Sequence, residues 1–178
     1  MKKLGANTYK HLSEDIRKER AKELVEVLLE VGINFATGVP CAVQKYIIKE
    51  IEKRREILHV PAVRESEAIG IAAGAVIGGR KAVIYMQNSG FLNSIHNISS
   101  LLLTYKIPVT FLITWRGCPG EDATHHLIDG KITLPILSLL KIKYFIIFQH
   151  NIRNLILKAS KILEKNKSVA LIVKRGVF

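Results

Sequence analysis

An acidic side chain, Glu65, stands at the start of a stretch that is otherwise built largely from Ala and Gly. The stretch reads Arg64-Glu65-Ser66-Glu67-Ala68-Ile69-Gly70-Ile71-Ala72-Ala73-Gly74. Small residues let a second backbone approach closely, and an acid in such a dry contact needs a partner or a proton. The alternative is that Glu65 only complements the helix N-terminus. Glu67 lies two positions on and is expected to face nearly the opposite side of the helix.

A second polar group follows an apolar strand. The strand expected over 82–86 leads into Gln87-Asn88-Ser89-Gly90. An amide, a hydroxyl and a backbone N–H at a helix start can bind a carboxylate. The alternative is a plain turn in which Ser89 caps the next helix.

The third group is the polar loop over 116–126. Arg116 carries a planar fork of donors that suits a sulfonate or a phosphonate. His125 and His126 are adjacent, and a neutral imidazole can transfer a proton near neutral pH. Either histidine could instead be an ordinary surface-loop residue.

Six short apolar strands alternate with helices along the chain, which predicts an α/β fold with a doubly wound, mostly parallel six-stranded sheet and helices on both faces. We expect strands over 33–36, 56–60, 82–86, 109–115, 144–148 and 168–174. We expect helices over 13–31, 43–55, 65–77, 92–105, 127–140 and 152–163. Such sheets bind ligands at the carboxyl ends of their strands, where all three polar groups are expected.

The motifs together resemble a known family. Gly38-Val39-Pro40, the stretch over 64–74, Met86-Gln87-Asn88-Ser89-Gly90 and Trp115-Arg116-Gly117 occur in this order. The pattern resembles the pyrimidine-binding domain of thiamine-diphosphate-dependent decarboxylases, in particular the sulfopyruvate and phosphonopyruvate decarboxylase branch. In that family a glutamate nine residues before such a glycine hydrogen-bonds the aminopyrimidine ring. Glu65 stands nine residues before Gly74.

The resemblance implies roles for particular residues. It implies a catalytic group of Glu65, His126 and His125, cofactor contacts from Glu65, Pro40 and Gly90, and substrate contacts from Val39, Asn88, Ser89 and Arg116. The branch commonly has Asp-Ala-Pro-Glu-His where this chain has Asp122-Ala123-Thr124-His125-His126. His126 therefore matches the pattern, whereas Thr124 and His125 depart from it.

The resemblance also implies a cofactor and a partner. The cofactors expected are thiamine diphosphate and Mg²⁺, the latter held mainly by a diphosphate-binding (beta) subunit, because this sequence has only Asp129-Gly130 where a Gly-Asp-Gly motif is needed. No metal ligands are expected in this chain. The implied function is that of a decarboxylase subunit that converts sulfopyruvate to sulfoacetaldehyde and CO2, in coenzyme M biosynthesis. The alternatives are a phosphonopyruvate decarboxylase subunit and a non-catalytic regulatory relative of the same fold.

Composition adds further expectations. The chain has 178 residues, 48% of them hydrophobic, and a formal net charge of +12. We expect an N-terminal arm over 1–12 and a single domain over 13–178. The sequence shows no membrane span, and its two cysteines form no disulfide framework, so we expect a cytoplasmic protein. The positive charge fits nucleic acid, an anionic substrate or an acidic partner subunit, with nucleic acid disfavoured because the cations do not form one block.

Overall fold

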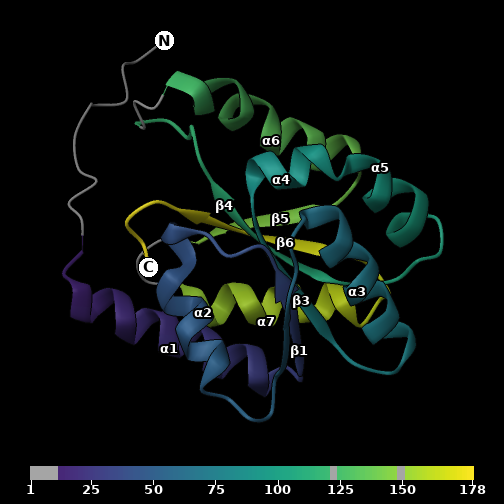
Figure 1. The fold of residues 1–178 in the computed structure, drawn as a ribbon, viewed down its shortest axis with the longest axis horizontal. Coiled ribbons are helices and arrows are strands. Elements are labelled where there is room, and N and C mark those ends of the chain that lie inside the picture. The colour runs from purple at the N-terminus through teal and green to yellow at the C-terminus, as the bar shows by residue number, and fades with distance from the viewer. Residues whose placement is uncertain (1–11, 121–123, 148–150) are drawn as a thin grey trace.

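The computed structural model describes residues 12–120, 124–147 and 151–178. Its six strands form one sheet in the order β2-β1-β3-β4-β6-β5, and every pairing is parallel (Figure 1). The strands are β1 (Phe35–Gly38), β2 (Leu58–Pro61), β3 (Ala82–Gln87), β4 (Thr110–Trp115), β5 (Lys143–Ile147) and β6 (Val169–Lys174). The doubly wound α/β fold predicted from the sequence is therefore confirmed. The arm expected over 1–12 lies, except for residue 12, outside the described residues.

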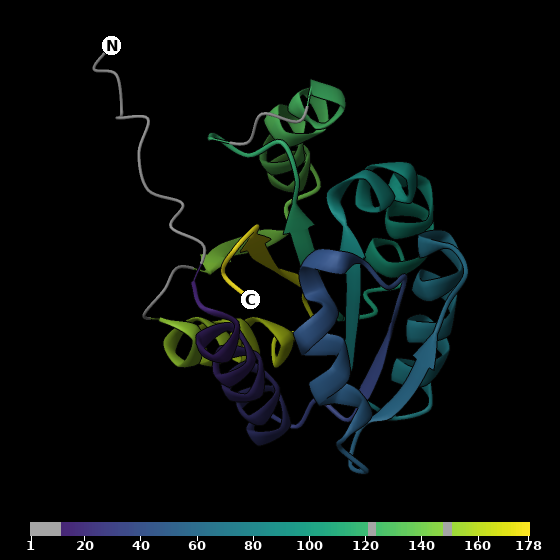
Figure 2. The same cartoon turned by 60° about the vertical axis from the view of Figure 1, so that its left-hand side comes forward.

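The helices cover the sheet on both faces. One face is covered by α1 (Glu14–Glu30), α2 (Lys45–Glu52) and α7 (Ile152–Leu163). The other is covered by α3 (Glu65–Ile77), α4 (Asn88–Asn93), α5 (Ile95–Asn97), a π-helical segment (Ile98–Leu103) and α6 (Leu127–Leu139). Short 3₁₀ turns at Ala42–Gln44 and Thr124–His126 precede α2 and α6. Figure 2 shows α1 and α7 side by side on their face of the sheet.

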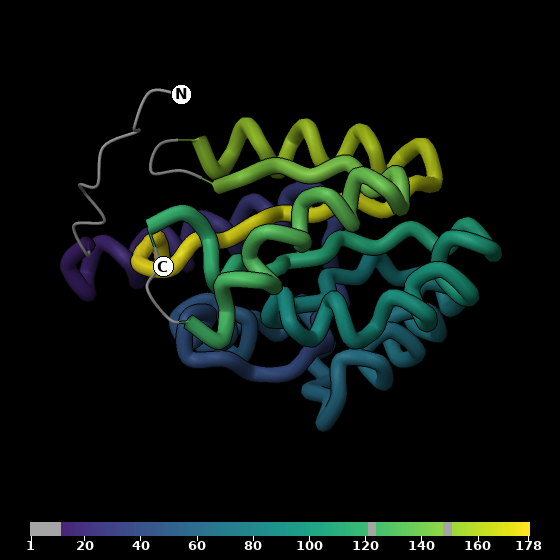
Figure 3. The backbone as a smooth tube through the Cα atoms, turned by 90° about the horizontal axis from the view of Figure 1, so that it is seen from above, coloured from purple at the N-terminus to yellow at the C-terminus, as the bar shows by residue number. Residues whose placement is uncertain are grey.

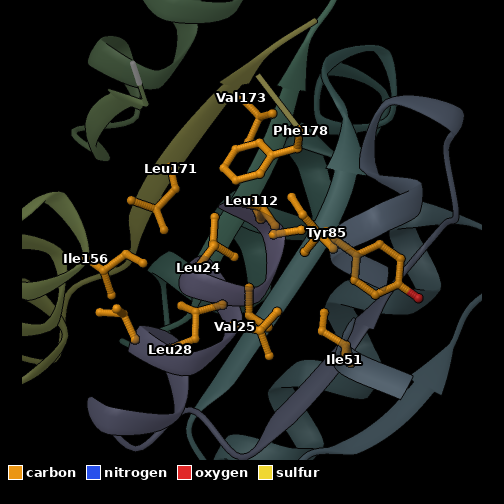
Figure 4. Close-up of a cluster of buried hydrophobic side chains, with 14 of the residues drawn as sticks. Leu24, Val25, Leu28, Ile51, Tyr85, Leu112, Ile156, Leu171, Val173 and Phe178 are labelled. Atoms are coloured by element: carbon orange, nitrogen blue, oxygen red, sulfur yellow. The ribbon is translucent and has the colours of Figure 1, made fainter. Parts of the chain in front are cut away.

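The core consists of one apolar cluster on each face of the sheet. In Figure 4, Leu24 and Leu28 of α1 reach toward Leu171 of β6 and Ile156 of α7. The strands β3, β4 and β6 are buried along almost their whole length, as expected for parallel strands covered on both faces. The buried sheet thus fixes the positions of the loops at the amino and carboxyl ends of its strands.

Two predicted helices are wrong in their bounds. The helix expected over 43–55 already ends at Glu52. The helix expected over 92–105 begins at Asn88 and is interrupted at Ser94, which is fully buried with φ −102° and ψ 10°. A π-helical segment then follows, with Thr104 N–H donating to Ser99 O at 3.2 Å. Apolar spacing alone did not reveal the early start, because Asn88 and Ser89 are poor helix formers that favour turns when considered in isolation.

The first helix is capped by Ser13. The Oγ of Ser13 accepts a hydrogen bond from the Ile16 N–H at 3.4 Å. Within the part of the chain that the structure describes, no helix combines the length and the apolar character that crossing a bilayer requires.

Candidate functional site

The candidate site lies where the strands end, and its best-defined contact joins Glu65 to Gly90. Glu65 is the first residue of α3, and Gly90 lies in the first turn of α4. A Cβ placed on Gly90 would lie 2.2 Å from both the Cδ and the Oε1 of Glu65. The carboxylate therefore lies directly across the glycine backbone, and any side chain at position 90 would push it away. Glu65 is half-buried, whereas Glu67 is exposed, as the helical spacing predicts.

The end of β1 forms the neighbouring part of the site. Gly38 has φ +151°, and a Cβ there would lie 1.9 Å from the carbonyl oxygen of Tyr85 on β3. Glycine is therefore required at this position. The next two residues, Val39 and Pro40, are half-buried and exposed respectively, at the same edge of the sheet as Glu65. This edge is where the cofactor and substrate contacts of Pro40 and Val39 are expected.

Tyr85 also fills the space that Gly38 leaves. Its ring lies 2.7 Å from the position of the missing Cβ, and its hydroxyl meets the Nε2 of His59 on β2 at 2.8 Å. The contact therefore spans the strand β1, and Figure 4 shows the hydroxyl pointing out of the apolar cluster. Burial raises the pKa of Tyr85 to about 12 and lowers the pKa of His59 below its ordinary value. The pair stays neutral near pH 7 and braces the end of β1.

Asn88 has a structural role that sequence reasoning missed. Its side chain is fully buried, and its Nδ2 donates to the carbonyl of Arg116 at 2.9 Å and to Thr133 Oγ1 at 3.0 Å. Its Oδ1 accepts a hydrogen bond from the N–H of Arg116 at 3.1 Å. Asn88 thus fixes the backbone of Arg116 from the end of β3. Its partner Thr133 lies 45 residues away, so no local pattern could reveal this role.

Ser89 is the more accessible polar residue of the same turn. It is half-buried inside the first turn of α4, and its Oγ accepts a hydrogen bond from Gln87 Nε2 at 2.9 Å. Since α4 starts at Asn88, Ser89 is not the residue that precedes the helix. Ser89 directly precedes Gly90, whose backbone lies against the Glu65 carboxylate.

Two glycines bring the loop after β4 against the start of α6. A Cβ on Gly130 would lie 1.9 Å from the carbonyl oxygen of Gly117, and a Cβ on Gly117 would lie 1.8 Å from that of His126. Gly117 also has φ +70°, which a side chain would disfavour. Trp115 Nε1 donates to the Gly130 carbonyl at 2.8 Å. These contacts fix the histidine turn relative to Trp115-Arg116-Gly117.

The two histidines occupy the 3₁₀ turn that precedes α6. Their ring centroids are 4.0 Å apart, His125 is exposed and His126 is half-buried. The helix α6 packs against α4, which carries Gly90, so the turn belongs to the same edge as Glu65. His126 is therefore the less solvent-exposed of the two histidines.

One cation at this edge was not singled out from the sequence. Lys174, the last residue of β6, is in register with Trp115 of β4, and its Nζ lies 5.4 Å from the centroid of the indole ring. The side chain of Lys174 therefore lies at the carboxyl edge of the sheet, on the side away from Glu65. A register argument could have found it, because strands that end together present their last side chains together.

Among residues 12–120, 124–147 and 151–178, no group of three or more His, Cys, Asp or Glu is placed to hold a metal ion.

Comparison with known proteins decides the family. The profile of the thiamine pyrophosphate enzyme N-terminal TPP binding domain matches residues 19–132, which include Glu65, Gly90 and both histidines. The chain belongs to the thiamine pyrophosphate enzyme family. The resemblance inferred from the sequence is confirmed, and TPP, which is thiamine diphosphate, is the cofactor that this family's domain binds.

The names of individual relatives are more specific than the name of the family, because they state a reaction. The sulfopyruvate decarboxylase subunit alpha of Methanocaldococcus jannaschii is 46% identical over 119 residues, which cover 67% of this chain and 70% of that protein. The protein of the same name in Methanococcus maripaludis is 38% identical over 125 residues, covering 70% of this chain and 75% of that protein. Phosphonopyruvate decarboxylase of Streptomyces viridochromogenes is 35% identical over 128 residues, covering 71% of this chain but 32% of that longer protein.

The residues of this chain fit one end of TPP. Because position 90 is a glycine, the carboxylate of Glu65 can lie directly against its backbone, and both residues stand in the first turns of helices that follow strands. A carboxylate so placed can accept a hydrogen bond from a ring N–H. The site thus suits the aminopyrimidine end of the cofactor.

Proposed function

We propose that this chain is a subunit of a thiamine-diphosphate-dependent 2-oxo acid decarboxylase that converts sulfopyruvate to sulfoacetaldehyde and CO2. The observation that carries the proposal is the Glu65 carboxylate held across Gly90 at the carboxyl edge of the sheet. Relatives that are 38–46% identical and named sulfopyruvate decarboxylase subunit alpha support the choice of reaction.

Glu65 acts on the cofactor. When bound, TPP would supply the nucleophilic carbon and the electron sink that decarboxylation of a 2-oxo acid requires. The carboxylate of Glu65 holds a proton at the ring nitrogen of the aminopyrimidine, which makes the exocyclic nitrogen basic. Gly90 leaves the space that the Glu65 carboxylate occupies, and Pro40 contacts the cofactor from the end of β1. Glu65 is therefore the residue on which activity depends most strongly.

The substrate contacts come from the neighbouring strand ends. Ser89 and the backbone around it bind the keto-acid carboxylate, and Val39 forms an apolar wall. Arg116 pairs with the sulfonate through its fork. Asn88, whose amide binds the backbone of Arg116, contributes by placing that residue. His126, with His125 against it, hands a proton to the carbon that CO2 has left.

A partner subunit completes the site. The name subunit alpha of the relatives supports a second chain, and we assign the diphosphate and Mg²⁺ ligands to that chain. The described residues of this chain hold no cluster suited to a metal ion. The cofactor would then lie between the two subunits.

The acidic group of the substrate is the open choice within this proposal. A phosphonate carries more negative charge near pH 7 than a sulfonate and so needs a second cation. The loop over 116–126 offers Arg116 and two histidines beside Glu121 and Asp122, a balance that favours the sulfonate. Lys174 adds a cation to the same edge of the sheet. This extra positive charge weakens the argument from charge against a phosphonate. The higher identity to the sulfopyruvate enzymes keeps sulfopyruvate as the first choice.

The test is turnover by the reconstituted complex. We expect CO2 release from sulfopyruvate when this chain is combined with a TPP-binding partner chain and Mg²⁺, and slower release from phosphonopyruvate and from pyruvate. The isolated chain should bind TPP weakly and turn over none of the three. A preference for pyruvate would contradict the substrate assignment, and full activity of the isolated chain would contradict the need for a partner.

A further inference from the structure

The candidate site lies at the carboxyl ends of the strands, and the opposite edge of the sheet, where the strands begin, is rich in lysine. The turns that lead into β4, β6 and β5 contain five lysines, which we call the amino-edge lysines: Lys106, Lys141, Lys143, Lys165 and Lys167. All five are exposed. Residues 131–178 as a whole carry ten Lys and Arg side chains against one carboxylate, Glu164. Much of the net charge of +12 is therefore concentrated in the last part of the chain.

The sheet brings these turns together. β4, β6 and β5 are neighbours, and Thr110, Val169 and Lys143 are in register across them. The three strands therefore begin at one level, and Figure 1 shows the chain entering them from the same side. Neighbouring strands are about 4.8 Å apart, so the amino-edge lysines occupy one continuous surface.

Two of the lysines stand at positions where glycine is favoured. Lys106 and Lys141 have φ of 54° and 56°, and each closes a helix with paired hydrogen bonds from its own N–H and from that of the next residue. Gly32 and Gly79 end α1 and α3 with the same pair of bonds. Glycine adopts this left-handed conformation freely, whereas a side chain is disfavoured there.

Complementing the helix dipole does not account for these lysines. A cation in the last turn of a helix provides that benefit without occupying the left-handed position. Lys81, for example, reaches the carbonyl of Val31 at the end of α1 with Nζ at 3.2 Å. No ion pair joins any amino-edge lysine to an acid within the described parts of the chain. Their charges point to an anionic partner outside this chain.

The surroundings of the amino-edge lysines indicate which kind of partner fits. β5 pairs only with β6 among the described strands, and its Tyr144, Phe145 and Ile146 are half-buried rather than covered. Figure 3 shows this strand next to α7 at the margin of the molecule. A cavity of about 420 Å³ opens at its start, lined by Ser138, Lys141, Ile142, Lys143 and Tyr144. An unpaired strand edge with half-covered apolar side chains suits an extended peptide.

We propose that the amino-edge lysines and the unpaired side of β5 together form a docking surface for an extended acidic protein segment. The segment adds a strand to β5 and places its carboxylates on the amino-edge lysines. Lys143 at the start of the edge strand opposes pairing with a second copy of this basic chain. A nucleic acid would use the lysines but not the free strand edge. The surface lies opposite Glu65, so docking there leaves the candidate active site open.

Two labelled peptides of equal charge test the proposal by fluorescence anisotropy at low salt. The first alternates Glu and Val, and the second has Pro in place of every Val so that its backbone cannot pair with a strand. We expect the first peptide to bind several-fold more tightly than the second. Its binding should weaken as added salt shortens the screening length.

Variants of the protein separate the surface from the fold. We expect Lys106→Gly combined with Lys141→Gly to weaken binding of the Glu-Val peptide by about fivefold, since each exposed ion pair contributes little. The same variant should melt no lower than the wild type, because glycine relieves the left-handed positions. The control pair Lys22→Gln and Lys49→Gln removes equal charge from α1 and α2 and should bind the peptide as the wild type does.

Several results would overturn the proposal. Equal binding of the two peptides would remove the role of the strand edge. Equal loss of binding in the control variant would mean that only net charge matters. Duplex DNA that displaces the Glu-Val peptide at equal charge concentration would show that the surface selects nucleic acid instead.

Discussion

Replacing Gly90 by Ala tests the position of the Glu65 carboxylate without touching the carboxylate itself. The new Cβ would lie 2.2 Å from Glu65 Cδ, whereas an ordinary contact needs at least 3.4 Å. The side chain of Glu65 must therefore move by about 1.2 Å. A displacement of about 1 Å in a catalytic group can lower the rate by about 100-fold, and we expect a fall of that size in kcat.

The effect of Gly90→Ala on stability is expected to be much smaller. Crowding a packed site costs about 1–3 kcal/mol, but alanine is favoured over glycine inside a helix by up to about 1 kcal/mol. The free energy of unfolding should thus fall by about 0–2 kcal/mol. Urea unfolding of the isolated chain measures the stability, and CO2 release by the reconstituted complex measures kcat.

Gly74→Ala is the matched control for that stability measurement. A Cβ on Gly74 meets no atom within 4 Å, so the same chemical change should stabilise the isolated chain by up to about 1 kcal/mol. A folded Gly90→Ala complex that keeps more than about a third of wild-type kcat would refute the argument from position, because a shift of 1.2 Å in a catalytic acid should cost far more.

Two further predictions concern stability. Burial lowers the pKa of His59, so the unfolded chain takes up a proton more readily than the folded one as the pH falls below about 6.5. The free energy of unfolding should therefore decrease below that pH and level off once the folded ring is protonated, and His59→Gln should show a flatter profile in urea unfolding from pH 5 to 8. Asn88→Ala leaves the buried polar groups of Arg116 and Thr133 without their partner and should lower the free energy of unfolding by about 2–4 kcal/mol in the same assay. The exposed Asn93→Ala serves as its control, and equal losses in the two variants would contradict the role given to Asn88.

The fold was largely predictable from the sequence because its signals are local. Apolar runs indicate β3, β4 and β6, which are buried on both faces, and Gly32 and Gly79 follow directly on the last turns of α1 and α3. The break at Ser94 was not predictable, because the burial of that residue depends on packing between α4, α3 and the sheet. Local propensity favoured a later helix start than the tertiary structure allows.

The candidate site was also predictable only in part. Glu65 was singled out because the residues around it fit a recognisable family pattern, whereas an acid at a helix start is by itself explained by the helix dipole. The contacts of Asn88 with Arg116 and Thr133, and the close approach of Gly117 and Gly130, join residues far apart in the sequence. Such contacts follow from strand order, which a single sequence does not reveal.

The most direct test of the central claim compares Glu65→Gln with Glu67→Gln in the reconstituted complex, with sulfopyruvate as substrate. Glutamine keeps the shape of the side chain but cannot hold the shared proton as a carboxylate does. We expect CO2 release to fall by on the order of 10²-fold or more for Glu65→Gln, and to stay near the wild-type rate for Glu67→Gln, whose side chain is exposed. If the two variants release CO2 at the same rate, the catalytic role assigned to Glu65 is wrong.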